Sequence, residues 1–208
     1  MDSLRVEQES FPFPDGGATP TSTLQLQLKL VPAALALKLY DKWHYLHATP
    51  FIGSIHFGIW FDGEWMGAIS YGPPNATEFT PYWNRSTQNG WWEIKRMALS
   101  PFCPKNSESR SIAISINLLR KMERCKGIVT YADTAQGHEG TIYKATGFLY
   151  LGLTDEKQDF CINGVIQQRG TTKDKEGKWI PRSRKHAFIK LLEAHHATDA
   201  RDRRPDQK

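Results

Sequence analysis

Residues 127–153 restrict the possible folds more than any other stretch of this 208-residue chain. The β-branched run Ile128–Tyr131 predicts a buried strand, and the segment from His138 predicts a helix that Gly147 can end. A second strand, Phe148–Leu151, follows at once. Such a strand–helix–strand unit favours a sheet with helices packed against it.

The segments before this unit predict antiparallel strands. Thr23–Val31 alternates apolar with polar residues, which indicates a half-buried strand. Ile55–Phe61 and Glu64–Tyr71 are joined by Asp62–Gly63, a residue pair typical of a tight hairpin turn. Trp91–Leu99 predicts a further strand.

Two helices and a last strand complete the order. Ala33–Trp43 contains good helix formers, and a helix that Ser107 or Ser109 could cap runs to about residue 124. His186–Leu192 predicts a final strand, with a short helix as the alternative. The expected fold class is α/β (α+β), with a mixed, mostly antiparallel central sheet flanked by helices on both faces.

Composition divides the chain into one domain and two tails. Residues 1–22 are rich in Pro, Gly, Ser and Thr and predict a flexible arm, and residues 193–208 predict a disordered polar tail. Residues 23–192 have the length of a single domain, with a basic hairpin or loop insertion at about 155–183. The net charge of +5 is compatible with a polyanionic partner.

Three features of the sequence bear on the compartment. No run approaches the ~18 apolar residues that a membrane-spanning helix needs, and the acidic, polar N-terminus does not resemble a signal peptide. Cys103, Cys125 and Cys161 are odd in number and widely spaced. We therefore expect a protein of a reducing cytoplasm that does not associate with membranes. Cys103 and Cys125 also lack a recognisable His partner motif, which argues against cysteine catalysis.

The predicted order of elements resembles the GNAT acyltransferase fold. Members of that superfamily usually bind the pyrophosphate of acyl-CoA at a Gly-rich loop and helix N-terminus after the fourth strand. The corresponding stretch here, Ser100–Ser111, contains no glycine, and Glu108 would repel phosphate. Lys105, Arg110 and the serine hydroxyls of the stretch compensate only in part. This departure argues against ordinary acetyl-CoA use.

Four motifs give a more specific resemblance, to the Mom family of bacteriophage DNA-modification proteins. They are WHY at 43–45, EIKRMAL at 93–99, the Ser-rich helix start after it, and YADTAQGHEGTIYKATGF at 131–148. The resemblance implies transfer of a carbamoylmethyl group to the N6 amine of adenine in double-stranded DNA. Such a modification shields phage DNA from host restriction enzymes, so the implied location is the cytoplasm of the bacterial host cell.

The resemblance also implies the functional positions. They map to His44, Arg96, Asp133, Tyr143 and a serine that is either Ser111 or Ser115. Members are thought to bind iron, so Fe(II) is an implied cofactor. The donor of the transferred group is either an acyl-CoA thioester or an amino-acid-derived compound. Arg96, Lys105, Arg110 and Ser111 are the candidate contacts to that donor.

Elementary chemistry leaves several interpretations open for the metal and proton-transfer candidates. His44 can be a general base or a metal ligand, or a surface residue after a helix. Asp133 can be a second hard ligand for Fe(II), can orient the target amine, or can simply form a turn. His138 or His47 could supply a third ligand. Tyr143 can donate a hydrogen bond to developing charge, or be a core aromatic residue.

Arg96 is costly to bury in a strand without an anionic partner. It therefore either pairs with a carboxylate or holds a charged group of the donor. The alternation of the strand predicts that Arg96 shares a face with Ile94 and Ala98.

DNA contacts fall on two groups of residues. An adenine inside a duplex must be flipped out of the stack before its amine can react. Aromatic side chains in or beside the long loop at 72–90 could stack on a base or cover the sheet: Tyr82, Trp83, Trp91 and Trp92. Basic side chains could bind phosphates or form a solvated face: Arg169, Lys173, Lys175, Lys178, Arg182, Arg184 and Lys185.

Two other functions stay open on the sequence alone. One is a GNAT-type N-acyltransferase that uses acyl-CoA on a small amine or a protein lysine. The other is a non-catalytic DNA-binding protein with the same fold. The oligomeric state is also open, with a homodimer among the alternatives.

Overall fold

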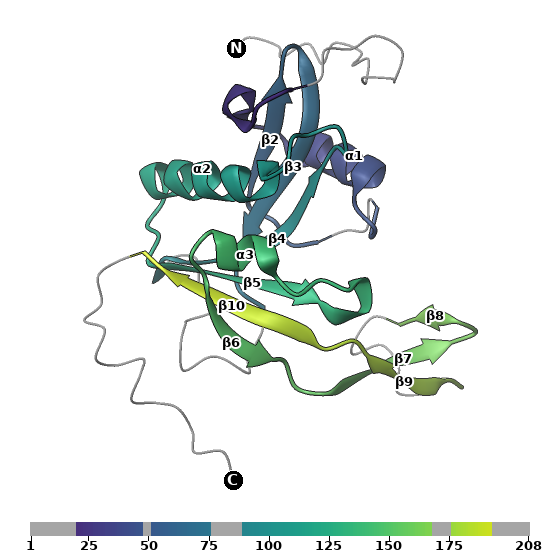
Figure 1. Cartoon of the computed structure of the whole chain (residues 1–208). Helices are drawn as coiled ribbons and strands as arrows, with labels where there is room; N and C mark the ends of the chain where they lie inside the picture. The colour runs from purple at the N-terminus through teal and green to yellow at the C-terminus, as the bar shows by residue number, and fades with distance from the viewer. Residues whose placement is uncertain (1–19, 48–50, 76–88, 168–175, 193–208) are drawn as a thin grey trace, which may run out of the picture.

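The computed structural model describes residues 20–47, 51–75, 89–167 and 176–192 (Figure 1). The predicted tails, except residues 20–22, lie outside the described residues. Two sheets and three α-helices make up the described part. The helices are α1 (Ala33–Trp43), α2 (Ser107–Met122) and α3 (Thr141–Ala145), with 3-10 turns η1 (Thr23–Gln25) and η3 (Thr134–Gln136).

The large sheet has seven strands in the order β1-β2-β3-β4-β5-β10-β6. Their bounds are β1 Gln27–Leu30, β2 Ile55–Phe61, β3 Glu64–Gly72, β4 Trp91–Leu99, β5 Gly127–Asp133, β6 Leu149–Leu153 and β10 Lys185–Leu191. All neighbouring pairs are antiparallel except β4 and β5. This parallel pair is short, since only Trp91–Glu93 lies beside Gly127–Val129. The C-terminal halves of β4 and β5 are therefore not paired with each other, and the two strands diverge.

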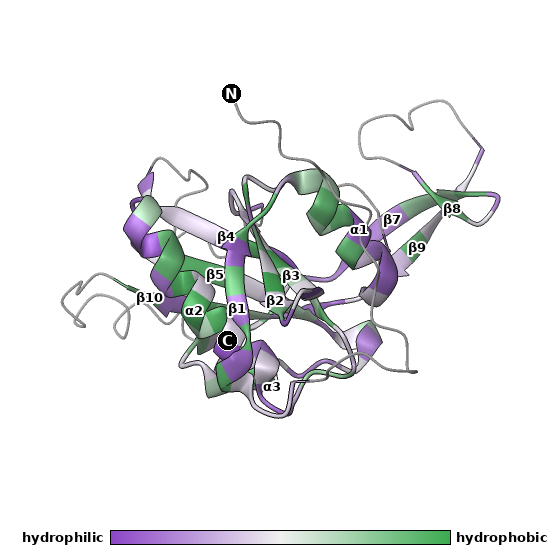
Figure 2. Cartoon of the chain, turned by 90° about the horizontal axis from the view of Figure 1, so that it is seen from above, coloured by the Kyte–Doolittle hydropathy of each residue, from purple (hydrophilic) through white to green (hydrophobic). Residues whose placement is uncertain are grey.

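Helices pack on both faces of this sheet, as Figure 2 shows from above for α1 and α2. On one face, α2 and α3 bury Ile112, Ile116 and Tyr143 in the same core cluster as Ile69 of β3. On the other face, α1 forms a second cluster with Ala68 of β3. The mixed, mostly antiparallel α/β fold that the sequence predicts is confirmed.

The predicted hairpin is confirmed at Asp62–Gly63. Both residues have positive φ, 42° and 91°, which matches the right-handed twist of the two strands. Strands β2 and β3 on either side pair from Phe61 and Glu64 outward.

The strand predicted over Thr23–Val31 is too long. Its first part is instead the turn η1, which a capping box stabilises. The Ser22 side chain accepts a hydrogen bond from the backbone of Gln25, and the Gln25 side chain accepts one from the Ser22 N–H in return. Only Gln27–Leu30 pairs with β2. Leu24 is 73% exposed as a result, although the leucine alternation predicted it on the buried face.

Helix α2 begins differently from the prediction. Its N-cap is Asn106, in the left-handed region at φ 73°, and not Ser107 or Ser109. Those two hydroxyls donate to the carbonyls of Pro104 and Asn106 instead. The side chain of Asn106 makes no capping hydrogen bond.

Helix α3 is shorter than the sequence predicts, since it begins at Thr141 and not at His138. Gly137 and Gly140 both adopt positive φ, so the chain turns twice before the helix can start. Its end is confirmed at Gly147. The Gly147 N–H donates to Lys144 and the Phe148 N–H to Tyr143, the pattern of a Schellman motif.

The segment predicted as a basic hairpin or loop forms a second sheet of three strands. These are β7 (Lys157–Ile162), β8 (Val165–Ile166) and β9 (Lys178–Arg182), in the order β8-β7-β9. We call this sheet the arm, because it extends beyond the ends of β6 and β10 in Figure 1. None of the helices in the described part of the chain is long and apolar enough to span a membrane.

Candidate active site

A β-bulge in β4 sets the direction of Arg96. Ser70 of β3 pairs with Arg96, but the next residue, Tyr71, pairs with Ile94, so Lys95 is the extra residue. Ile94 therefore joins the cluster under α2, whereas Arg96 turns to the face covered by α1. The prediction that Arg96 shares a face with Ile94 is wrong, because simple alternation does not include the bulge.

Arg96 is buried among aromatic rings. Its guanidinium lies 4.6 Å from the ring centroid of Phe51 and 5.6 Å from that of Tyr40, as in cation–π contacts. Its Nη1 donates to the His47 carbonyl at 3.0 Å. The Tyr40 hydroxyl in turn donates to the Arg96 carbonyl at 3.2 Å. These contacts hold both the backbone and the side chain of Arg96 in place.

His44 caps the end of α1, and its Nδ1 accepts a hydrogen bond from the Leu46 N–H at 3.1 Å. Burial, helped by the charge of Arg96, lowers the pKa of His44 to about 4. The imidazole is therefore neutral at neutral pH, and its proton sits on Nε2 because Nδ1 is the acceptor. In this state the ring can donate a hydrogen bond. The arrangement favours a donor role over the general-base role.

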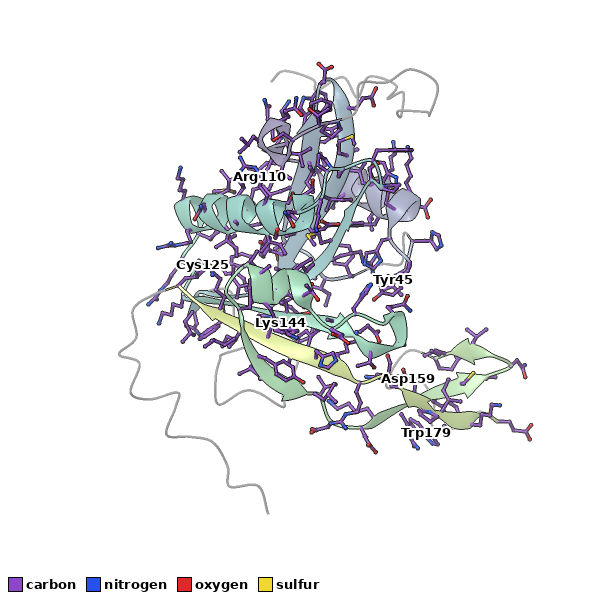
Figure 3. The ribbon with its side chains drawn as sticks, in the orientation of Figure 1. Tyr45, Arg110, Cys125, Lys144, Asp159 and Trp179 are labelled. Carbon is purple, nitrogen blue, oxygen red and sulfur yellow. The ribbon has the colours of Figure 1, made fainter. Side chains whose placement is uncertain are left out.

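Tyr45 lies at the centre of the predicted site residues, although the sequence analysis did not single it out. Its ring stacks on His44 with centroids 4.4 Å apart, and it meets the His138 ring edge-on at 6.2 Å. Burial and the Asp133 carboxylate raise the pKa of Tyr45, while Arg96 lowers it. Figure 3 shows Tyr45 between the end of α1 and the turn after β5. Its position inside the WHY motif was the available signal.

Asp133 ends β5 and begins the turn η3. Its Oδ1 accepts a hydrogen bond from the Ala135 N–H at 3.0 Å, and its Oδ2 lies 3.9 Å from the Lys185 Nζ. Asp133 therefore does form a turn, as one of its interpretations predicts. The same carboxylate faces Tyr45 closely enough to raise its pKa, so turn formation does not remove it from the site.

Tyr143 is buried on α3, where its ring packs against Phe148 and Phe188. Burial raises the pKa of Tyr143, and the nearby Tyr45 adds to the shift. The Thr130 side chain lies near the phenol and lowers that pKa slightly. Thr130 Oγ1 nevertheless has no hydrogen bond of good geometry among the described residues. A buried phenol beside an unsatisfied hydroxyl is able to donate to a bound group.

The two candidate serines have different surroundings on α2. Ser115 Oγ donates to the Ile112 carbonyl at 2.9 Å and lies 2.7 Å from the Tyr71 hydroxyl. Ser111 Oγ is buried and has no hydrogen-bond partner in the described part of the chain. The hydroxyl of Ser115 is thus used in hydrogen bonds within the core. The hydroxyl of Ser111 is the one that can still form a hydrogen bond with a ligand.

The candidate donor contacts do not converge. Lys105 is exposed in the loop before α2. Arg110 lines a shallow groove of about 630 Å³ that runs over α2, together with Asn106, Arg120 and Lys190. This groove includes none of His44, Arg96, Asp133 and Tyr143 in its lining. Arg110 therefore lies on a different surface of the protein from Arg96.

The residues present do not fit the implied iron. Nδ1 of His44 is engaged by the Leu46 N–H, and Asp133 is engaged by Ala135 and Lys185. His47 Nδ1 lies 2.9 Å from the Asp41 carbonyl. Within the described ranges, no three His, Cys, Asp or Glu side chains are grouped so that they could hold a metal ion. The predicted ligand pair of His44 and Asp133 gains no support, and no chemical step is assigned to a metal below.

The cysteines show no sign of activation. Burial raises the pKa of Cys103 to about 11, so its thiol is protonated at neutral pH. Cys125 is buried.

Most of the candidate DNA contacts in the described residues have intramolecular partners. Arg182 forms a two-pronged ion pair with Asp159, Arg184 lies 3.8 Å from Glu156, and Lys185 faces Asp133. Lys178 is exposed on the arm. Trp91 packs over Gly127, and Trp92 donates to the Arg124 carbonyl, so both belong to the sheet. The remaining candidates lie outside the described residues: Tyr82, Trp83, Arg169, Lys173 and Lys175.

Comparison with known proteins gives a family and a fold. A model of the Mom protein family matches residues 25–201. The methylcarbamoylase Mom of Escherichia phage Mu is 24% identical over 132 residues, which cover 62% of this chain and 54% of that protein. The chain thus matches about half the length of this relative.

Solved structures of GNAT acetyltransferases share the fold. The spermidine/spermine N-acetyltransferase SpeG from Vibrio cholerae superposes with a TM-score of 0.52 at 12% identity, over 81% of this chain and 94% of SpeG. A Bacillus subtilis acetyltransferase in complex with CoA gives a TM-score of 0.51 at 13% identity, over 81% and 99% of the two chains. At these identities the likeness concerns the fold alone.

Proposed function

This chain belongs to the Mom protein family, and we propose that it is a transferase that adds a carbamoylmethyl group to the N6 amine of adenine in double-stranded DNA. The modified DNA would resist restriction enzymes of the bacterial host, in whose cytoplasm the protein would act. The observation that carries the proposal is the placement of four side chains from four separate segments near Tyr45. The His44 ring stacks on Tyr45, and Arg96, Asp133 and Tyr143 interact electrostatically with its phenol.

The site supplies the groups that alkylation of an aryl amine needs. In the proposed reaction, N6 attacks the carbon that the donor transfers, a new N–C bond forms, and the bond to the leaving group breaks. Asp133 takes the proton that N6 loses, because a carboxylate at the mouth of the site is a competent base. Tyr143 gives the leaving group its proton. The Tyr143 phenol is protonated at neutral pH and therefore has a proton to give.

Arg96 and His44 orient the donor in this proposal. Arg96 is a fixed cation, since rings and a carbonyl hold its guanidinium, and it suits an acyl oxygen or an anionic group of the donor. His44 adds a neutral N–H donor. Ser111, whose hydroxyl has no partner in the described part of the chain, is a further candidate contact. An amino-acid-derived compound that carries its leaving group on the methylene carbon would supply the group, whereas attack on an acyl-CoA thioester would place a carbonyl carbon on N6.

Nucleoside analysis tests the function directly. The protein is expressed with a reporter plasmid, the plasmid is digested to nucleosides, and the products are analysed by mass spectrometry. We expect a deoxyadenosine product heavier by the carbamoylmethyl group. Soluble protein that leaves only unmodified deoxyadenosine would contradict the proposal.

Two variants separate catalysis from simple DNA binding. Asp133→Asn keeps a side-chain oxygen for the Ala135 N–H but removes the charge, so it preserves the turn. We expect Asp133→Asn and Tyr143→Phe each to reduce the modified fraction at least about 100-fold, as loss of general acid–base catalysis does. Glu156→Gln, which changes an exposed carboxylate just before the arm, is the control and should modify DNA normally. Equal modification by all three variants would exclude the assigned roles.

A further inference from the structure

Tyr45 differs from the aromatic residues of the core, because 42% of it is exposed although it lies at the centre of the site. Exposed aromatic rings on a protein surface are usually mobile and have no fixed direction. This ring is held, since His44 stacks on it at 4.4 Å with an interplanar angle of 26°. His44 is itself fixed by the hydrogen bond from the Leu46 N–H. Tyr45 is therefore a rigid aromatic surface that stays accessible.

Polar groups lie near this surface. The His138 ring meets the Tyr45 ring edge-on at 6.2 Å, and the His138 N–H donates to the Asp133 carbonyl at 3.3 Å. The Asp133 carboxylate and the Arg96 guanidinium both influence the pKa of the Tyr45 phenol. A planar ring with a carboxylate at its rim has the chemistry to receive a flat heterocycle that carries an amine. The ring stacks on the heterocycle, and the carboxylate accepts a hydrogen bond from the amine.

We propose that Tyr45 is the stacking platform for the adenine that leaves the duplex, with Asp133 at its rim to accept a hydrogen bond from the exocyclic amine. This inference rests on the proposed function and names the residue that holds the base. The second lone pairs of the Asp133 oxygens remain for the amine, since among the described residues Oδ1 accepts only the Ala135 N–H and Oδ2 faces Lys185 at 3.9 Å. Thymine has no exocyclic amine, so the platform selects against it.

A binding experiment on the full chain tests the platform without any donor. The probes are short single-stranded oligodeoxyadenylate and oligodeoxythymidylate, because a single strand presents its bases without the cost of flipping. Affinity is measured by fluorescence anisotropy at one fixed salt concentration. We expect the unchanged protein to bind oligodeoxyadenylate more tightly than oligodeoxythymidylate.

Three variants assign the binding to the ring. Tyr45→Phe keeps the ring and should bind oligodeoxyadenylate within about twofold of the unchanged protein. Tyr45→Leu removes it and should bind about tenfold more weakly, the lower part of the range for loss of one base–aromatic stack. Tyr150→Leu is the control, because Tyr150 is half exposed on β6 beside His186 and should not affect binding. A matching thermal melt for each variant verifies the fold.

The outcomes separate the platform from the proposed reaction. Equal affinity of Tyr45→Leu and the unchanged protein for oligodeoxyadenylate would overturn the platform, and so would absence of measurable binding by the unchanged protein. If plasmid adenine is modified while Tyr45→Leu binds normally, the function stands and the platform fails. If no modified nucleoside forms but binding depends on the Tyr45 ring, the platform stands and the proposed reaction fails.

Discussion

Two serines one helical turn apart on α2 have opposite relations to the core. Ser115 lies 2.7 Å from the Tyr71 hydroxyl, which is fully buried and has its pKa raised by burial. Ser111 is equally buried, but its hydroxyl has no partner among the described residues. A buried polar group without a partner costs stability, and where proteins retain one, a functional role or a bound water, ion or ligand is a common reason.

This difference predicts opposite effects of the same substitution. Ser115→Ala should lower the free energy of unfolding by about 1–3 kcal/mol, because it leaves the Tyr71 hydroxyl unsatisfied. Ser111→Ala should leave the free energy of unfolding unchanged or raise it slightly, because it removes an unsatisfied group. Urea denaturation of both variants measures the two values. A loss for Ser111→Ala as large as that for Ser115→Ala would show that the Ser111 hydroxyl has a partner in the folded protein.

At the scale of elements, the start of α3 depends on a close approach of backbone to ring. Gly140 adopts φ 71°, and a Cβ added there would lie 2.2 Å from the Phe188 ring of β10. Gly137 has a similar φ of 66°, but nothing lies within 4 Å of an added Cβ. The two glycines share the backbone requirement and differ only in the space around them. Gly140 thus seats the helix that carries Tyr143 against the sheet.

The pair of glycines gives a matched test of that contact. Gly137→Ala should cost about 1–2 kcal/mol of stability, the penalty for a left-handed residue with a Cβ. Gly140→Ala should cost about 1–3 kcal/mol more, because the methyl group also displaces the Phe188 ring or α3. Thermal or urea unfolding measures both variants. Equal losses would mean that the backbone conformation alone, and not the packing on Phe188, requires glycine at 140.

At the scale of the whole molecule, the arm is attached to the large sheet but does not share its core. Among the residues that the structure describes, the hydrophobic core clusters contain none from β7, β8 or β9. Within the arm, Phe160 packs on Trp179, and Arg182 pairs with Asp159. Figure 3 shows Asp159 and Trp179 on the arm, apart from α2 and α3. A unit with its own few contacts can open while the rest stays folded.

Asp159→Asn should therefore loosen the arm and leave the large sheet intact. The Arg182–Asp159 pair is largely buried, with side chains 21% and 16% exposed, so its loss should cost about 1.5–3 kcal/mol locally. Hydrogen exchange should accelerate in β7 and β9 and stay slow in β5 and β10. Glu156→Gln is the control, because its pair with Arg184 is exposed and should contribute little. Faster exchange in β5 as well would show that the arm and the sheet unfold together.

The sequence by itself determined the elements whose signal is local. The turn pair Asp62–Gly63, the strand at Trp91–Leu99 and the stop at Gly147 follow from backbone preferences and periodicity within a few residues. The motifs also named His44, Arg96, Asp133 and Tyr143 as candidates. In the structure the His44 ring stacks on Tyr45, and the other three interact electrostatically with its phenol.

Only the tertiary structure decided how those residues are presented. The bulge at Lys95 depends on the register between β3 and β4, and it moves Arg96 to the face of α1. The pairing of Arg182 with Asp159 depends on the register of the arm, and the exposure of Tyr45 depends on where α1 ends relative to β5. Such features arise from contacts between segments that are distant along the chain, and no local preference encodes them. The sequence therefore names the chemical groups of the site, and long-range packing determines their directions.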